Sequence, residues 1–123
     1  MNTPVNFEIA KLLKEKGFDE RPKSYNEDGK LVAVSLTIRR FNPEKIYYPA
    51  PTISEVIDWM YEKHGIWISV FEMERSEDWS NYFDYSIKQK KINGVDISKK
   101  LEEFNNPTEA YEAAILYTLK NLI

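Results

Sequence analysis

The chain has 123 residues, of which 42% are hydrophobic and 14% aromatic, and it contains no cysteine. This length suits one domain, residues 1–123, and the lack of cysteine excludes disulfide frameworks and thiolate metal sites. The net charge of -3 at pH 7 argues against a nucleic-acid partner, because phosphate binding needs a concentrated positive field. No apolar run suits a membrane span and no signal pattern opens the chain, so we expect a cytoplasmic protein with no membrane contact.

A first helix is predicted over residues 4–16. Thr3 is its expected N-cap, and Pro4 is its expected first residue, where a missing amide hydrogen costs nothing. Gly17, followed by the apolar Phe18, should end the helix. Its apolar stripe at helical spacing consists of Val5, Ile9, Leu12 and Leu13.

The next segment predicts a hairpin. Residues 21–29 are polar and end in the turn pair Asp28-Gly29. Apolar residues then alternate with other residues over positions 31–39, as in a strand with one buried face. Residues 23–26 are its expected partner, and the proline-containing residues 42–50 predict a loop with an extended piece at 46–48.

The clearest signals lie in residues 49–70. Thr52 and Glu55 have the spacing of a capping box, and Gly65 marks a left-handed helix end. Trp59 is predicted on the polar side of this helix. The opposite side carries an apolar stripe of Ile53, Val56, Ile57, Met60 and His64. Period-two alternation then predicts a strand over residues 66–74.

The second half adds a strand over residues 82–89 and a last helix with Asn106 as N-cap and Pro107 at its first position. This helix is apolar nearly all round, so we expect it to be central or to be covered by a partner, such as a second copy bound through residues 107–122. Residues 90–104 give no assignable pattern. The order α-β-β-α-β-β-α predicts an α+β single-domain sandwich with helices on a mainly antiparallel sheet.

Three segments carry a resemblance to a known family, namely NFEIAKLLKEKGF, APTISEVIDWMYEKHGIWISV and FNNPTEAYEAAILYTLKNLI. They resemble a family of small uncharacterised proteins from Bacteroides phages and integrated mobile elements, which in turn resemble the phage α-β-α sandwich domain. The resemblance covers both ends and the middle of the chain. It implies a fold and a setting in a bacterial host, and it implies no catalytic or binding residues.

Aromatic residues are the leading candidates for function. Trp59, Trp67, Phe71 and Trp79 fall on polar faces or in a loop, and exposed aromatic clusters often mark protein-binding sites. The competing interpretation is that they cover the second sheet face or the long loops. We expect a non-enzymatic accessory protein that acts through protein–protein interaction, without catalytic residues, metal or cofactor.

A nucleic-acid-binding module is the first alternative. Tyr82, Lys88, Lys90 and Lys91 offer an aromatic ring and positive charge for a single strand. The acidic run before them would repel phosphate, so a solvated hairpin is the favoured interpretation.

A carboxylate-based enzyme is the second alternative and ranks last. Glu72, Glu74 and Asp84 could supply paired carboxylates, but strands at a sheet edge often carry charge for other reasons. His64 is the only histidine, and we expect it to pack at the helix end, because a metal site or catalytic triad needs partners that the chain lacks.

Overall fold

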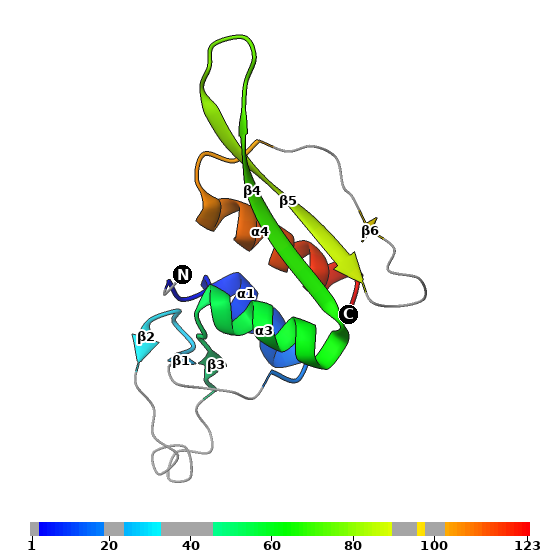
Figure 1. Ribbon diagram of the computed structural model, residues 1–123. Helices are drawn as coiled ribbons and strands as arrows, with labels where there is room; N and C mark the ends of the chain where they lie inside the picture. The colour runs from blue at the N-terminus through cyan, green and yellow to red at the C-terminus, as the bar shows by residue number, and fades with distance from the viewer. Residues whose placement is uncertain (1–2, 19–23, 33–45, 90–95, 98–102) are drawn as a thin grey trace.

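The computed structural model describes residues 3–18, 24–32, 46–89, 96–97 and 103–123 (Figure 1). Its elements are α1 (Phe7–Glu15), β1 (Ser24–Tyr25), β2 (Leu31–Val32), β3 (Tyr48–Pro49), α3 (Ile53–His64), β4 (Ile66–Glu74), β5 (Asn81–Gln89), β6 (Asp96–Ile97) and α4 (Pro107–Asn121). Helices combined with antiparallel sheets confirm the predicted α+β class. The predicted order is broadly matched, with the short strands β3 and β6 added.

The strands form two antiparallel sheets, ordered β2-β1-β3 and β4-β5-β6. In the smaller sheet, Ser24 lies opposite both Val32 and Pro49, so β1 joins the predicted hairpin to the extended piece before α3. Gly29 has a φ of 80°, which fits the turn predicted at Asp28-Gly29. Residues 33–39 of the predicted strand lie outside the described ranges.

Helix α3 confirms the strongest local prediction. The Thr52 hydroxyl accepts a hydrogen bond from the Glu55 N–H, and the Glu55 carboxylate accepts one from the Thr52 N–H, which completes the capping box. Gly65 ends the helix at φ 64°, in the left-handed region. Ile53, Val56, Ile57 and Met60 are buried, as the predicted stripe requires.

The start of α1 corrects the prediction made from local signals. Asn6, and not Thr3, is the N-cap, and its side-chain oxygen accepts the N–H of Ile9 at 2.9 Å. The residues before it pair with the start of α3: Val5 N–H donates to Pro51 O at 2.9 Å, and Ile53 N–H donates to Thr3 O at 3.1 Å. The helix begins later because these backbone groups are already hydrogen-bonded in an extended conformation.

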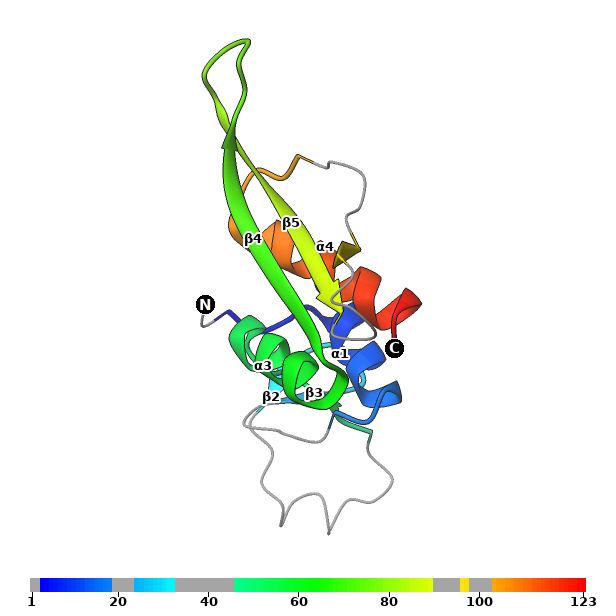
Figure 2. The same ribbon diagram turned by 45° about the vertical axis from the view of Figure 1, so that its right-hand side comes forward.

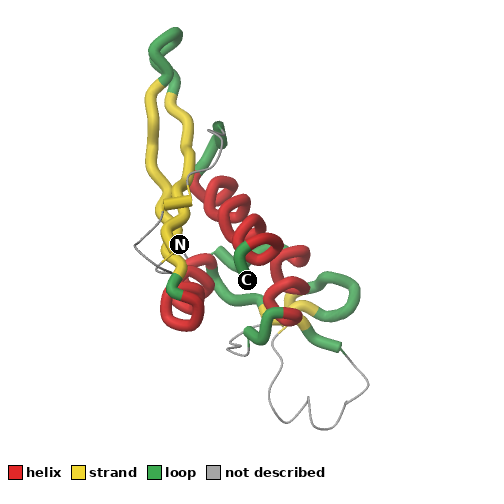
Figure 3. Tube along the Cα trace, turned by 90° about the vertical axis from the view of Figure 1, so that its right-hand side faces the viewer, coloured by secondary structure: helices red, strands yellow, loops and turns green. Residues whose placement is uncertain are grey.

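Helix α4 is central in the packing. It contacts α1, α3, β4 and β5, and it lies along one side of the β4–β5 hairpin (Figures 2 and 3). Asn106 caps it, with its side-chain oxygen 2.9 Å from the N–H of Glu109, and Pro107 occupies the first turn as predicted. This position accounts for the burial of Ala110, Ala114, Ile115 and Leu119. The largest fully buried side chains are Phe18, Ile9, Leu13, Ile53, Met60, Ile66, Ile68, Ile87, Ile115, Leu119, Val5 and Val56.

Candidate functional site

The β4–β5 hairpin projects away from the helices, which gather near its base (Figure 1). Its strands pair over nine residues each, from Ile66 opposite Gln89 to Glu74 opposite Asn81. Residues directly opposite each other in an antiparallel pair share a face, so this register defines two faces. We call them the inner face (Ile66, Ile68, Val70, Glu72 and Glu74 with Asn81, Phe83, Tyr85, Ile87 and Gln89) and the outer face (Trp67, Ser69, Phe71 and Met73 with Tyr82, Asp84, Ser86 and Lys88).

The inner face is covered only near the base. Ile66, Ile68, Tyr85 and Ile87 are buried in the same cluster as residues of α4. Val70 is partly buried against that cluster, which includes no residue from 71 to 84. Beyond Val70 the hairpin leaves this hydrophobic cluster. Phe83 still pairs with Phe104 through two backbone hydrogen bonds of 2.9 Å, and past this pair the described hairpin continues as a two-stranded ribbon.

The hairpin tip, residues 75–80, is closed by a set of hydrogen bonds. Arg75 N–H donates to Ser80 O at 2.8 Å, and Trp79 N–H donates to Arg75 O at 3.0 Å. The Arg75 guanidinium donates to the Ser80 hydroxyl at 2.7 Å, and this hydroxyl donates to the Asp78 carboxylate at 2.6 Å. The tip is thus held in a defined conformation by its own side chains.

Arg75 also ties the tip to the segment before α4. Its guanidinium lies 2.9 Å from a carboxylate oxygen of Glu103 and 5.2 Å from the ring centroid of Tyr82. The hydrogen bond to Glu103 raises the pKa of Arg75, and hydrogen bonds from Ser80 hold the pKa of Asp78 below its ordinary value. Both groups therefore stay charged at neutral pH.

Trp79 is the most exposed large hydrophobic residue of the described chain, at 76%. Its φ is 61°, and among the described residues no other non-glycine residue has a positive φ. A bulky side chain is rarely found in this left-handed region, because Cβ approaches the following carbonyl oxygen. The tip therefore holds a large apolar side chain in water on a strained backbone.

Trp59 does not lie on a polar surface, which corrects the sequence prediction. It is only 5% exposed. Its ring meets those of Phe18 and His64 in edge contacts, with centroids 5.2 and 4.9 Å away. The apolar stripe predicts that only one side of α3 is buried. A second side is also buried, because Phe18, which follows α1, packs against it. Trp59 belongs to the core and is unavailable to a partner.

The other three predicted aromatic residues are at the surface. Trp67 and Phe71 are 42% and 37% exposed and share the outer face, four residues apart on β4. Trp79 is separate from them, at the tip. Two further exposed residues extend the group, Met73 on the outer face and Tyr61, whose ring centroid is 5.4 Å from that of Trp67. The period-two alternation of β4 could have identified Met73.

The residues proposed for nucleic-acid binding are spread out. Tyr82 is near the tip and Lys88 is near the base, opposite Trp67. They are six positions apart along β5, which corresponds to roughly 20 Å. Lys90 and Lys91 lie outside the described residues. Residues 72–82 carry Glu72, Glu74, Glu77 and Asp78 against Arg75 alone, so negative charge dominates the projecting part.

The strand carboxylates are not brought together. Glu72 and Glu74 are on the inner face, and Glu72 accepts a hydrogen bond from the Asn81 side chain at 2.9 Å. Asp84 is buried on the outer face and accepts the N–H of Tyr85 at 2.7 Å. In the described ranges, no group of three or more His, Asp or Glu side chains is placed to hold a metal ion. His64 packs its ring on Trp59 at the end of α3, as predicted.

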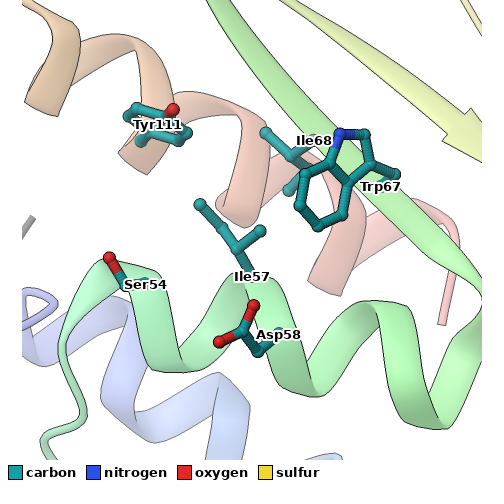
Figure 4. A pocket seen from close by; sticks show the side chains of 6 residues that line it. All are labelled: Ser54, Ile57, Asp58, Trp67, Ile68 and Tyr111. Carbon is teal, nitrogen blue, oxygen red and sulfur yellow. The ribbon is translucent and has the colours of Figure 1, made fainter.

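A small pocket lies at the base of the hairpin (Figure 4). It is lined by Ser54, Ile57 and Asp58 of α3, Trp67 and Ile68 of β4, and Tyr111 of α4, and its volume is about 200 Å³. Sites for small molecules usually measure roughly 300–1,000 Å³. The pocket therefore suits a single side chain better than a cofactor.

No protein-family model, curated protein or solved structure matches this chain. None of the helices in the described ranges combines the length and apolar character needed to cross a lipid bilayer. Functional residues therefore have to be identified from the geometry, and the exposed side chains of the projecting hairpin are the strongest group.

Proposed function

We propose that this chain is a protein-binding module that contacts its partner through the projecting β4–β5 hairpin, with Trp79 as the central contact. The main observation behind this proposal is that the Trp79 side chain is 76% exposed while its backbone has a φ of 61°. Strained residues of this kind cluster at functional sites, where the surrounding structure maintains them. Tryptophan is also among the residues that contribute most often to binding energy at protein interfaces.

The closed tip supports the same proposal. Hydrogen bonds from Arg75 to Ser80 and from Ser80 to Asp78 order the loop before any partner arrives. Less conformational entropy is then lost on binding, which strengthens association. The exposed Phe71 and Met73 on the outer face extend the apolar surface below the tip. A partner would bury these side chains in addition to that of Trp79.

The biological setting follows from the resemblance described above. A non-enzymatic accessory protein of a phage or integrated mobile element, acting in the cytoplasm of a bacterial host, fits a small chain whose exposed features favour binding. The acidic character of residues 72–82 favours a protein partner over nucleic acid. Self-association through α4 is less favoured, because that helix is already occupied by α1, α3, β4 and β5.

Photo-crosslinking from the tip tests the proposal. A photoreactive phenylalanine analogue at position 79 should link the chain to one stoichiometric partner in lysate of a Bacteroides host that carries the parent element. Affinity capture with the unmodified chain should recover the same partner, and Trp79→Gly should abolish that recovery.

The matched control is Ile46→Ala, which removes an exposed apolar side chain just before β3, far along the chain from the hairpin. It should leave capture unchanged. Recovery of the same proteins in equal amounts by wild type, Trp79→Gly and Ile46→Ala would contradict the proposal.

A further inference from the structure

Strand β4 is at an edge of its sheet. The order β4-β5-β6 gives it β5 on one side, and no strand in the described ranges pairs with its other side. Along nine residues, Ile66–Glu74, backbone N–H and C=O groups therefore point outward at alternate positions. Such an edge is a template for an added strand, and many proteins bind extended peptides in this way.

The pocket at the hairpin base lies at this same edge. Trp67 and Ile68 are consecutive residues, and their side chains are on opposite faces of β4. A cavity lined by both must lie beside the strand edge, and β5 occupies the other edge. Figure 4 shows α3 across the gap, with Ile57 pointing toward β4. An added strand would thus begin beside a ready-made recess for one side chain.

The side chains around the edge define the chemistry of a suitable peptide. Ile57, Ile68 and the ring of Trp67 form an apolar wall of the pocket, which faces the polar groups of Ser54 and Tyr111. Asp58 places an exposed carboxylate at its rim. Farther along β4, Glu72 and Glu74 are both exposed on the inner face. A residue of an added strand that lies opposite each glutamate would share that face, where lysine or arginine would be complementary.

We infer that the free edge of β4 binds an extended, basic peptide segment of the partner protein by strand addition. One apolar side chain of the segment fills the pocket, and lysine or arginine side chains at every second position lie opposite Glu72 and Glu74. The inference rests on the proposed function, because the segment belongs to the protein partner, but it concerns a surface separate from Trp79.

The test uses a displayed library of random nine-residue peptides, matched to the length of β4, selected against the full chain. Enriched peptides should combine an apolar residue with alternating lysine or arginine. Hydrogen exchange should slow at amides of β4 when the best peptide binds. A version of that peptide N-methylated at alternate amides keeps the side chains and loses strand pairing, so it should bind about tenfold or more weakly.

Charge reversal supplies the matched pair of protein variants. Glu72→Lys/Glu74→Lys should weaken the best peptide by about tenfold or more, whereas Glu8→Lys/Glu15→Lys makes the same change of net charge on α1 and should have little effect. Failure to enrich any peptide, equal binding of the N-methylated peptide, or equal loss in both charge variants would overturn the inference.

The outcomes separate this inference from the proposed function. If Trp79→Gly abolishes partner capture but Glu72→Lys/Glu74→Lys does not reduce it, strand addition is excluded and the hairpin tip is the binding site. If the Glu72→Lys/Glu74→Lys variant weakens peptide binding but Trp79→Gly does not reduce partner capture, the strand edge is the binding site and the hairpin tip is not.

Discussion

Replacing Trp79 with glycine or alanine separates backbone strain from side-chain packing. Both substitutions remove the same indole ring, which is 76% exposed and so contributes little packing. Alanine keeps the unfavourable left-handed backbone at φ 61°, whereas glycine adopts it freely. The left-handed conformation costs about 1–2 kcal/mol for a residue with Cβ, and glycine loses about 0.4–1 kcal/mol through the greater entropy of the unfolded chain. The glycine variant should therefore be more stable than the alanine variant by about 1 kcal/mol.

Urea denaturation of the two variants measures this difference directly. With a slope of about 1–3 kcal/mol per molar urea, the glycine midpoint should lie roughly 0.5 M above the alanine midpoint. The slopes should agree, since neither substitution changes the core. An alanine variant as stable as the glycine variant would refute the reasoning, because it would mean that the backbone at Trp79 is not strained. Both variants should lose partner capture, so this stability difference is independent of binding.

Three further predictions concern the body of the protein. Thr52→Ala should lower the free energy of unfolding by about 1 kcal/mol in urea denaturation, through loss of the capping box. Trp59→Ala should lower the free energy of unfolding by about 3–5 kcal/mol in the same assay, because the ring is buried. A loss below about 0.5 kcal/mol would show instead that the ring is exposed. Burial lowers the pKa of His64 from its ordinary 6.5, so the folded state resists protonation and stability should fall as the pH drops below that value. The urea midpoint should therefore drop more for wild type than for His64→Gln between about pH 7.5 and about pH 5.5, and parallel profiles would contradict this.

Sequence patterns predicted the elements whose signals are local. The capping box at Thr52, the left-handed Gly65 and the alternation of β4 and β5 depend on neighbours within a few residues, so the sequence displays them fully. The last helix was predictable for the same reason, since Asn106 and Pro107 both act within its first turn.

The errors arose where distant parts of the chain compete with local preference. Thr3 has the side chain of a cap, but its carbonyl accepts a hydrogen bond from Ile53, fifty residues later in the chain. The single apolar stripe of the helix predicts that Trp59 faces outward, but Phe18, from another segment of the chain, packs against its ring. The candidate site was partly predictable: Trp67, Phe71 and Trp79 are exposed, while the strained backbone of Trp79 depends on how Arg75 and Ser80 close the loop.

The projecting hairpin also affects how this protein can change over generations. Most substitutions are harmful because they destabilise the fold, and residues 71–82 lie outside the core cluster. The outer half of the ribbon can therefore accumulate substitutions while α3, α4 and the hairpin base keep the fold intact. Related chains should differ most along this ribbon and least at Ile66, Ile68 and Ile87, so that one scaffold can acquire new partners without losing its stability.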